Sequence, residues 1–407
     1  MLSSSFHEVD TAISDPTTYA QNGWEPHFAR LRREDPVHYV ADSIHGSYWA
    51  VTKFRDIEEV ERNHRIFSSD AELGGIQIRD RPPELVVRSF FLMDPPQHSE
   101  RRAVVNVLGL PRGVDPLEPL IRKTTRQVLD SLPRGEAFDW VDRVSVEITS
   151  TMLAALMDYP MEKKRELVNW SDVITADLSD PHSPVKSEDE REAAKWRFSD
   201  RMMELWQDRM QRPAENNLIS ILAHSPLFNE IDPREKMGTL TTFLVGGNDT
   251  TRNTMSGGLY ALSSFPDQLR RLRSDQSLIP TFVEESLRWQ TPVIHFRRTA
   301  LEDYDLGGKH IAKGDKVVLW YISANRDEDV IERPDEFTLD RKRPETHLSF
   351  GHGIHRCLGA RLARLQLNVL WEEFLARDIE FEVVQPPEYS HHLSIRGIRS
   401  MQVQLQA

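Results

Sequence analysis

The chain has 407 residues, of which 39% are hydrophobic and 28% are charged, and this length allows a substantial buried core. The formal net charge of −13 argues against nucleic-acid binding, and no apolar run approaches the length of a membrane-spanning helix. Since the sequence shows one cysteine and no secretory pattern, we expect a protein of the reducing cytoplasm.

Strand and loop signals dominate the first quarter of the chain. Residues 38–40 and 48–52 predict a short β-hairpin, and residues 56–63 predict a helix. Residues 70–93 contain a glycine pair and a proline pair and predict a long irregular loop. Loops of this length within a compact protein are usually functional or mobile.

The remainder of the chain has mainly helical patterns. Apolar residues at helical spacing dominate from about residue 99 to residue 290, with a break near residues 179–190. Strands are predicted at residues 295–299, 315–321, 379–384 and 401–405. The sequence therefore predicts a mainly α protein with small β-sheets, and we expect residues 1–407 to form a single domain.

A long helix is predicted over residues 237–264, with the unusual sequence Gly-Gly-Asn-Asp-Thr-Thr at residues 246–251 in its middle. Each interior glycine costs a helix roughly 1 kcal/mol relative to alanine, which suggests that something approaches the backbone closely. Thr250 can donate a hydrogen bond to the carbonyl of Gly246 and open the helix locally. An acid and a hydroxyl at Asp249 and Thr250 suit proton relay, although alone they also fit a structural helix weakened by glycine.

The single cysteine lies in the sequence Phe-Gly-His-Gly-Ile-His-Arg-Cys-Leu-Gly, residues 350–359. One thiol cannot form an internal disulfide or a multi-cysteine zinc site, but it can be an axial ligand to haem iron. Glycines let the backbone pass close to a flat macrocycle, and Phe350 is placed to shield the sulfur. Because a buried helix is predicted just after Cys357, its N-terminus would stabilise the thiolate. Without the glycines and His355, a small core residue would be the simpler interpretation.

The pattern Phe-Gly-x-Gly-x-His-x-Cys-x-Gly resembles the haem-thiolate loop of the cytochrome P450 monooxygenases, and residues 246–251 resemble the oxygen-binding motif of that family. The resemblance covers essentially the whole chain. It implies the P450 fold, with haem b buried between the central helix and the cysteine loop. It also implies Cys357 as the iron ligand, Asp249 and Thr250 as catalytic residues, and Gly246, Phe350 and Gly359 beside the haem.

Further residues match family positions. The resemblance implies that the haem propionates are bound by His98, Arg102, Arg298 and His355, with Arg297 as the competing choice beside Arg298. Glu285 and Arg288 match the family's Glu-x-x-Arg element, and we interpret this ion pair as structural.

Four segments resemble the bacterial alkane and fatty-acid terminal hydroxylases, which oxidise the ω carbon of linear chains: residues 246–253, 287–292, 295–300 and 317–321. The resemblance implies hydroxylation of the terminal methyl of a medium-chain alkane or fatty acid. The alternatives are a terpene or steroid hydroxylase, a peroxide-driven peroxygenase and a non-catalytic haem-based gas sensor. The acid–alcohol pair of Asp249 and Thr250 disfavours the last two.

An apolar substrate requires an apolar pocket above the haem. The predicted substrate contacts are Ile76, Ile78, Leu240, Phe243, Leu244, Val293, Ile294, Leu393 and Ile395. The resemblance further implies a monomer that uses O2 and receives electrons from a ferredoxin and an NAD(P)H-dependent ferredoxin reductase. A basic group near the cysteine loop suits an acidic donor, or equally a set of solvated helix faces: Arg101, Arg102, Arg122, Lys123, Arg356, Arg361 and Arg364.

Overall fold

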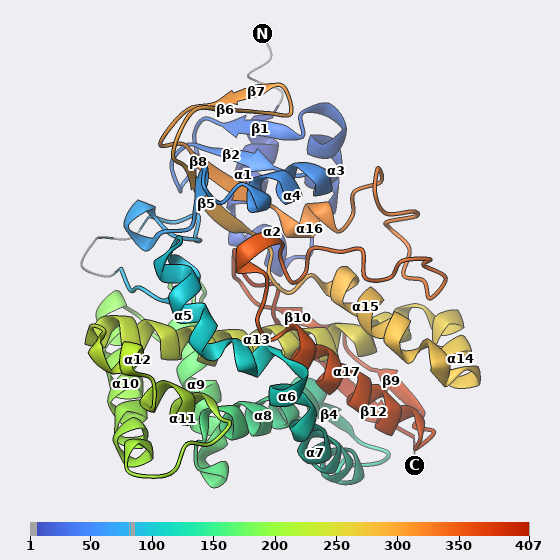
Figure 1. The fold of residues 1–407 in the computed structure, drawn as a ribbon. Helices are drawn as coiled ribbons and strands as arrows, with labels where there is room; N and C mark the ends of the chain where they lie inside the picture. Colours follow the sequence, from blue (N-terminus) through green and yellow to red (C-terminus); the bar gives the residue numbers. More distant parts are fainter. Residues whose placement is uncertain (1–5, 81, 83–85, 407) are drawn as a thin grey trace.

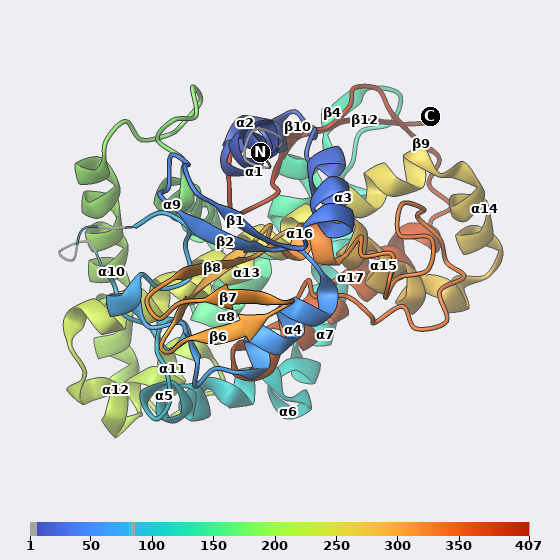
Figure 2. The same ribbon diagram turned by 90° about the horizontal axis from the view of Figure 1, so that it is seen from above.

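The computed structural model describes residues 6–80, 82 and 86–406. Most strands lie at one end of the molecule and most helices at the other, where a smaller sheet lies among them, and one long helix, α13 (Pro233–Ser264), crosses the middle (Figure 1). Seen from above, the strands lie over the central helices (Figure 2). This arrangement confirms the predicted mainly α fold with small sheets. No helix in the described ranges is both long and apolar enough to cross a membrane.

The largest sheet joins segments from both ends of the chain. Its strand order is β1 (Val37–Val40), β2 (Tyr48–Val51), β8 (Lys316–Leu319), β5 (Phe296–Ala300) and β3 (Phe67–Ser68). The first two strands form the predicted antiparallel hairpin, and β2 pairs parallel to β8 with Ala50 opposite Val318. The strands predicted near residues 295–299 and 315–321 are confirmed as β5 and β8.

Three smaller sheets complete the β structure of the described residues. The strands predicted at residues 379–384 and 401–405 are present as β9 (Phe381–Val383) and β12 (Gln402–Leu405). The sequence analysis did not anticipate the other five strands: β4 (Ala137–Asp139), β6 (Tyr304–Leu306), β7 (Lys309–Ile311), β10 (Glu388–Tyr389) and β11 (Ile398–Ser400).

The helices before α13 are α1 (His7–Ser14), α2 (Pro16–Ala20), α3 (Glu25–Glu34), α4 (Phe54–Arg62), α5 (Gln97–Val105), α6 (Pro111–Val114), α7 (Glu118–Asp130), α8 (Glu147–Met157), α9 (Lys164–Thr175), α10 (Glu188–Met210), α11 (Leu218–Ala223) and α12 (Pro226–Glu230). After it come α14 (Pro266–Ser274), α15 (Ile279–Gln290), α16 (Tyr321–Ala324) and α17 (Ala360–Leu375). The gap between α9 and α10 confirms the predicted break near residues 179–190. The first three helices were not predicted.

The central helix α13 begins one turn earlier than predicted. Asp232 caps its N-terminus by accepting a hydrogen bond from the amide of Arg234, and Pro233 occupies the first helical position. Its ends belong to different cores: Leu240 and Leu244 pack with α8, α10 and α11, whereas Met255 and Leu259 pack with α15 and α17. The glycine-rich middle lies at the junction between these cores.

The predicted ion pair on α15 is confirmed. Arg288 Nη2 lies 2.7 Å from Glu285 Oε1, and neither side chain is exposed. Arg288 also donates to the carbonyls of Asn325, Pro334 and Glu336. The pair therefore holds the irregular segment that leads to the cysteine loop.

Candidate functional site

The cysteine loop has a conformation that its glycines allow. Gly351 and Gly353 have φ angles of +67° and +64°, in the left-handed region that favours glycine. A Cβ on Gly353 would lie 2.3 Å from the carbonyl oxygen of Glu61 on α4, so a larger residue would displace the loop. The amide of Cys357 donates to the carbonyl of Phe350 at 2.9 Å and closes the turn three residues before α17.

The Cys357 side chain is surrounded by protein atoms but is itself exposed, and it lines a hollow of the surface. Burial raises the pKa of its thiol, whereas the Gly359 amide and the guanidinium groups of Arg102 and Arg356 lower it. A bound metal ion would overcome the effect of burial, since coordination deprotonates a thiol outright. Cys357 is therefore a thiol that one metal centre can reach.

Phe350 lies at the start of the loop and is half-buried. The guanidinium carbon of Arg364 lies 4.5 Å from its ring centroid, and the ring of His347 lies 5.9 Å away. The ring also packs against the core formed by α15 and α17. This packing fixes the position of the segment that leads to Cys357.

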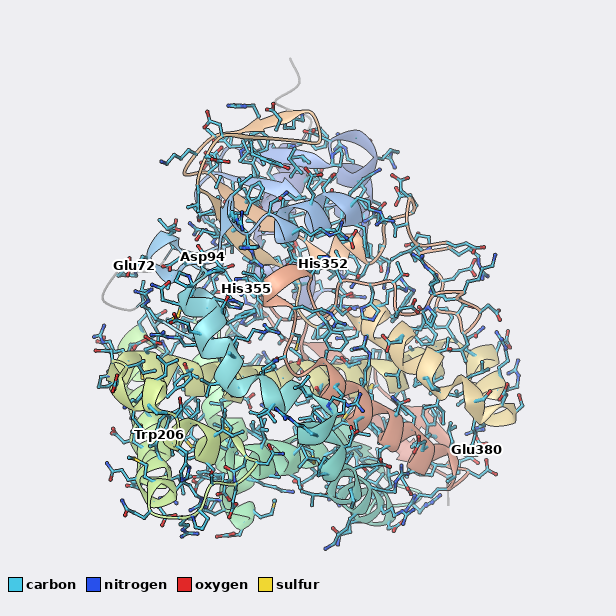
Figure 3. The ribbon with its side chains drawn as sticks, in the orientation of Figure 1. Glu72, Asp94, Trp206, His352, His355 and Glu380 are labelled. Atoms are coloured by element: carbon cyan, nitrogen blue, oxygen red, sulfur yellow. The ribbon has the colours of Figure 1, made fainter. Side chains whose placement is uncertain are left out.

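Two buried histidines lie together between α5 and the loop. The ring centroids of His98 and His355 are 4.4 Å apart, and Figure 3 shows His355 beside α5, below Asp94. Burial lowers the pKa of His98 to about 4 and that of His355 to about 2, with neighbouring arginines acting in the same direction. Neither ring has a hydrogen-bond partner among the described residues. Because buried polar groups are normally paired, these imidazoles indicate a polar ligand group beside the two rings.

The two predicted arginines flank the same histidines. Arg102, one turn after His98 on α5, donates to the carbonyl of Arg356 at 2.6 Å. Arg298 on β5 lies close enough to His355 to lower its pKa. Arg297 instead faces away, pairing with Asp80 and donating to the Leu73 carbonyl at 3.1 Å. The structure thus brings His98, Arg102, Arg298 and His355 together and separates Arg297 from them.

The middle of α13 faces open space on one side. A Cβ added to Gly246 would meet nothing within 4 Å, and Gly246 is exposed although its helix crosses the centre of the molecule. Thr250 Oγ1 donates to the Gly246 carbonyl at 3.1 Å, which confirms the predicted hydrogen bond. This face of α13 therefore leaves room for a ligand.

Asp249 lies on a neighbouring face of α13, where it is almost fully buried. Its carboxylate accepts hydrogen bonds from Ser171 at 3.2 Å, from Asn248 at 2.9 Å and from Arg252 at 2.9 Å. Arg252 also binds Asp172 of α9 at 3.1 Å. Burial raises the pKa of Asp249 to about 6, with Arg252 acting in the opposite direction. Sequence reasoning missed these α9 partners, because no local pattern reports a contact about 80 residues away.

The predicted substrate contacts differ in exposure. Ile76, Phe243, Val293 and Ile395 are half-buried, and Val293 forms a β-bridge with Ile395. The others are packed in the cores with almost no exposed surface: Ile78, Leu240, Leu244, Ile294 and Leu393. The half-buried group therefore has the surface with which to contact a ligand, and the assignment of all nine stays a prediction.

The basic group near the loop is largely neutralised. Arg101 pairs with Glu235, Arg122 with three glutamates, Arg361 with Asp115 and Arg364 with Glu284. Arg356 is exposed, and its guanidinium has no ion pair within the described ranges. It borders a surface hollow of about 400 Å³ that also reaches Cys357 and Leu358. A partner bound at this hollow would therefore lie close to the Cys357 sulfur.

The fold and this site together define a haem protein with one thiol beside the cofactor. Residues 50–392 match the model of the cytochrome P450 family. The chain is 43% identical to the structure of cytochrome P450-153 from Novosphingobium aromaticivorans, with a TM-score of 0.91 and coverage of 97% of this chain and 99% of that one. It is 41% identical to CYP153D17 from Sphingomonas sp. PAMC 26605, with a TM-score of 0.92 and coverage of 99% and 100%.

Among curated proteins, linalool 8-monooxygenase of Pseudomonas putida is 35% identical over 97% of this chain and 98% of its own length. A steroid C26-monooxygenase of Mycolicibacterium smegmatis is 32% identical over 92% and 89%. The chain belongs to the cytochrome P450 family, and the enzyme is a P450 monooxygenase whose cofactor is haem b.

The residues of the site fit haem. Haem iron can be held by a single thiolate, which Cys357 would supply, and the macrocycle needs room beside a helix, which Gly246 leaves. Two propionate groups need cationic and hydrogen-bonding partners, and two unpartnered imidazoles lie here with two arginines.

Proposed function

We propose that the protein hydroxylates the terminal methyl of a medium-chain alkane or fatty acid, with Cys357 as the residue that would hold the haem iron. When bound, haem supplies the oxygen-activating redox chemistry. The observation that carries the proposal is the exposed Cys357 thiol, which lines a surface hollow, in a chain that matches P450 structures over nearly its whole length.

The cofactor's carboxylates are assigned to the cluster between α5, β5 and the loop. Arg102 and Arg298 supply positive charge, and His98 and His355 each supply one imidazole N–H in their neutral form. These assignments give the buried rings the partners that they otherwise lack. Gly359 and Phe350 shape the surface around the sulfur, and Gly246 leaves room on the other side.

Proton transfer is assigned to two side chains in the middle of α13. Asp249, with a pKa of about 6, exchanges a proton readily near neutral pH. Thr250 lies at the open face, where its hydroxyl would relay a proton toward O2 when the cofactor is bound. Because Asp249 is held by Ser171 and Arg252, its carboxyl stays buried and away from bulk water.

The preference for a linear substrate rests on two observations. The motif segments resemble terminal hydroxylases. The two P450-153-type structures share 43% and 41% sequence identity with this chain, compared with 35% for linalool 8-monooxygenase. Oxidising a methyl group in preference to the weaker methylene C–H bonds requires end-on positioning of the chain. The half-buried Ile76, Phe243, Val293 and Ile395 supply an apolar wall for this purpose.

A second candidate substrate is a terpene alcohol. It is favoured by the 35% identity to a protein named as linalool 8-monooxygenase. A steroid is a further possibility, since a steroid C26-monooxygenase is 32% identical to this chain.

We propose that electrons come from a ferredoxin and an NAD(P)H-dependent ferredoxin reductase, in a monomeric cytoplasmic enzyme. The exposed Arg356 beside the hollow that reaches Cys357 supports docking of an acidic donor at this surface.

A substrate titration tests the proposal. Lauric acid, octane, linalool and a steroid are added separately to the haem-loaded protein, and the shift of the Soret band is recorded with product analysis by mass spectrometry. We expect saturable shifts and ω-hydroxylated products from lauric acid or octane. A response confined to linalool or the steroid would replace the linear substrate by that class. A Cys357→Ser variant that kept the red-shifted band of the reduced carbon monoxide complex would refute the ligand assignment.

A further inference from the structure

Glu61 is a buried carboxylate that the proposed chemistry does not use. It lies at the C-terminal end of α4, and only 4% of its surface is exposed. Burying an ionised carboxylate is costly unless it is paired and fully hydrogen-bonded. The contacts of Glu61 show how this cost is met, and each comes from a different segment of the chain.

One carboxylate oxygen binds two side chains. Arg298 Nη2 donates to Glu61 Oε1 at 3.1 Å, and Tyr321 Oη donates to the same oxygen at 2.7 Å. Arg298 is on β5 and Tyr321 is on α16, and both are buried. Burial raises the pKa of Glu61, whereas Arg298, Tyr321 and the His352 amide lower it.

The second carboxylate oxygen binds the cysteine loop. The backbone amide of His352 donates to Glu61 Oε2 at 2.7 Å, five residues before Cys357. The backbone of Glu61 also contacts the loop closely, since a Cβ on Gly353 would collide with its carbonyl. One side chain therefore connects the loop that carries the sulfur to the arginine assigned to a propionate.

We propose that Glu61 is a positioning residue for the haem, which orients Arg298 toward a propionate and fixes the cysteine loop relative to it. The inference rests on the propionate assignment of Arg298 made above. Arg298 then lies between two carboxylates, one from the protein and one from the cofactor. The buried negative charge of Glu61 also favours oxidised over reduced iron, because added negative charge near a metal lowers its reduction potential.

The test compares Glu61→Gln with Glu58→Gln. Glu58 lies one turn earlier on α4 and approaches the same loop, with Oε1 3.6 Å from His352 Nδ1, but it makes no contact with Arg298 among the described interactions. Haem transfer to excess apomyoglobin gives the rate of haem loss, and a redox titration gives the midpoint potential. We expect Glu61→Gln to lose haem about tenfold faster, equivalent to about 1.4 kcal/mol, and to shift the potential upward. Glu58→Gln should leave the rate of haem loss unchanged and shift the potential less, because it removes a nearby charge without altering the contacts of Arg298.

Glu61→Gln with a wild-type potential and rate of haem loss, or with changes equal to those of Glu58→Gln, would overturn the inference. Arg298→Gln separates this outcome from failure of the proposed function: if it does not affect haem loss, the propionate assignment itself is wrong. If Glu61→Gln does not fold, Tyr321→Phe replaces it. Since that variant leaves Oε1 to Arg298 alone and draws Arg298 away from the propionate, haem loss should accelerate. An unchanged rate would also overturn the inference.

Discussion

Asp249 has a pKa of about 6 because burial opposes its charge more strongly than Arg252 stabilises it, and Asp172 raises the pKa further. A buried acid that titrates near neutral pH fits proton transfer better than a permanent ion pair. Above pH 6 its protonated fraction falls about tenfold per pH unit. The rate of product formation under saturating reductant should therefore fall from pH 6 to pH 8.

The substitution Asp249→Asn should slow turnover by about 100-fold and remove this pH dependence. Asp172→Asn is the informative companion, because it removes a charge that raises the pKa of Asp249 and leaves every residue of α13 in place, although it breaks the ion pair of Asp172 with Arg252. We expect its inflection to move below pH 6. The measurement is the rate of product formation from pH 5.5 to pH 8.5; an identical profile in all three proteins would exclude Asp249 from the relay.

Thr250 and Thr254 make the same local hydrogen bond, but they face different surroundings. Thr250 Oγ1 donates to Gly246 at the open face, whereas Thr254 Oγ1 donates to Thr250 at 3.0 Å and is fully buried. Thr250→Ala should leave NADH oxidation largely intact while product per NADH falls by roughly tenfold, because reduced oxygen escapes as peroxide. Thr254→Ala should remain coupled. Equal coupling in the two variants would indicate another proton route.

At the scale of elements, α15 organises a segment with little regular structure. Glu285 accepts hydrogen bonds from Arg288, Arg341 and the amide of Thr338, and it has no exposed surface. Replacing Glu285 by Gln leaves two arginines around a neutral group. The expected cost is about 3–5 kcal/mol of unfolding free energy.

Urea unfolding followed by circular dichroism measures this cost. Glu284→Gln is the control, since Glu284 pairs with His347 and Arg364 nearer the surface, with 13% of its side chain exposed. We expect Glu284→Gln to lose clearly less stability than Glu285→Gln. Similar losses would mean that complete burial of the Glu285–Arg288 pair does not increase its contribution to the free energy of unfolding.

Elements with a strong local signal were predictable, and elements held by distant partners were not. Helix α13 showed its period over many turns, and only its first turn was missed, although Asp232 and Pro233 carry a helix-start signal. The hairpin of β6 and β7 was missed despite Gly307-Gly308 between the strands. In the site, Cys357, Thr250 and the histidines followed from motifs. Glu61 did not, because its partners come from three segments that only the fold brings together.

At the scale of the molecule, the net charge of −13 and the exposed Arg356 act on an acidic electron donor in opposite directions. The net charge repels the donor over a distance set by the screening length, which is about 30 Å at 0.01 M salt and about 10 Å at 0.1 M. Contacts of Arg356 act over a few ångströms and weaken only at higher salt. The rate of haem reduction by an acidic ferredoxin should therefore rise as salt is first added and then fall above about 0.1 M.

Two charge reversals separate these effects. Arg356→Glu and Arg197→Glu change the net charge equally, but only Arg356 borders the hollow beside Cys357. Arg197 is exposed on α10, which lies away from α17 and the cysteine loop in Figure 1. Stopped-flow reduction at several salt concentrations should show a several-fold loss for Arg356→Glu and no falling limb at high salt. Arg197→Glu should retain the falling limb and differ from the wild type only at low salt, where net repulsion dominates. If the two variants behaved alike, long-range repulsion alone would govern the encounter and the donor would not dock at this hollow.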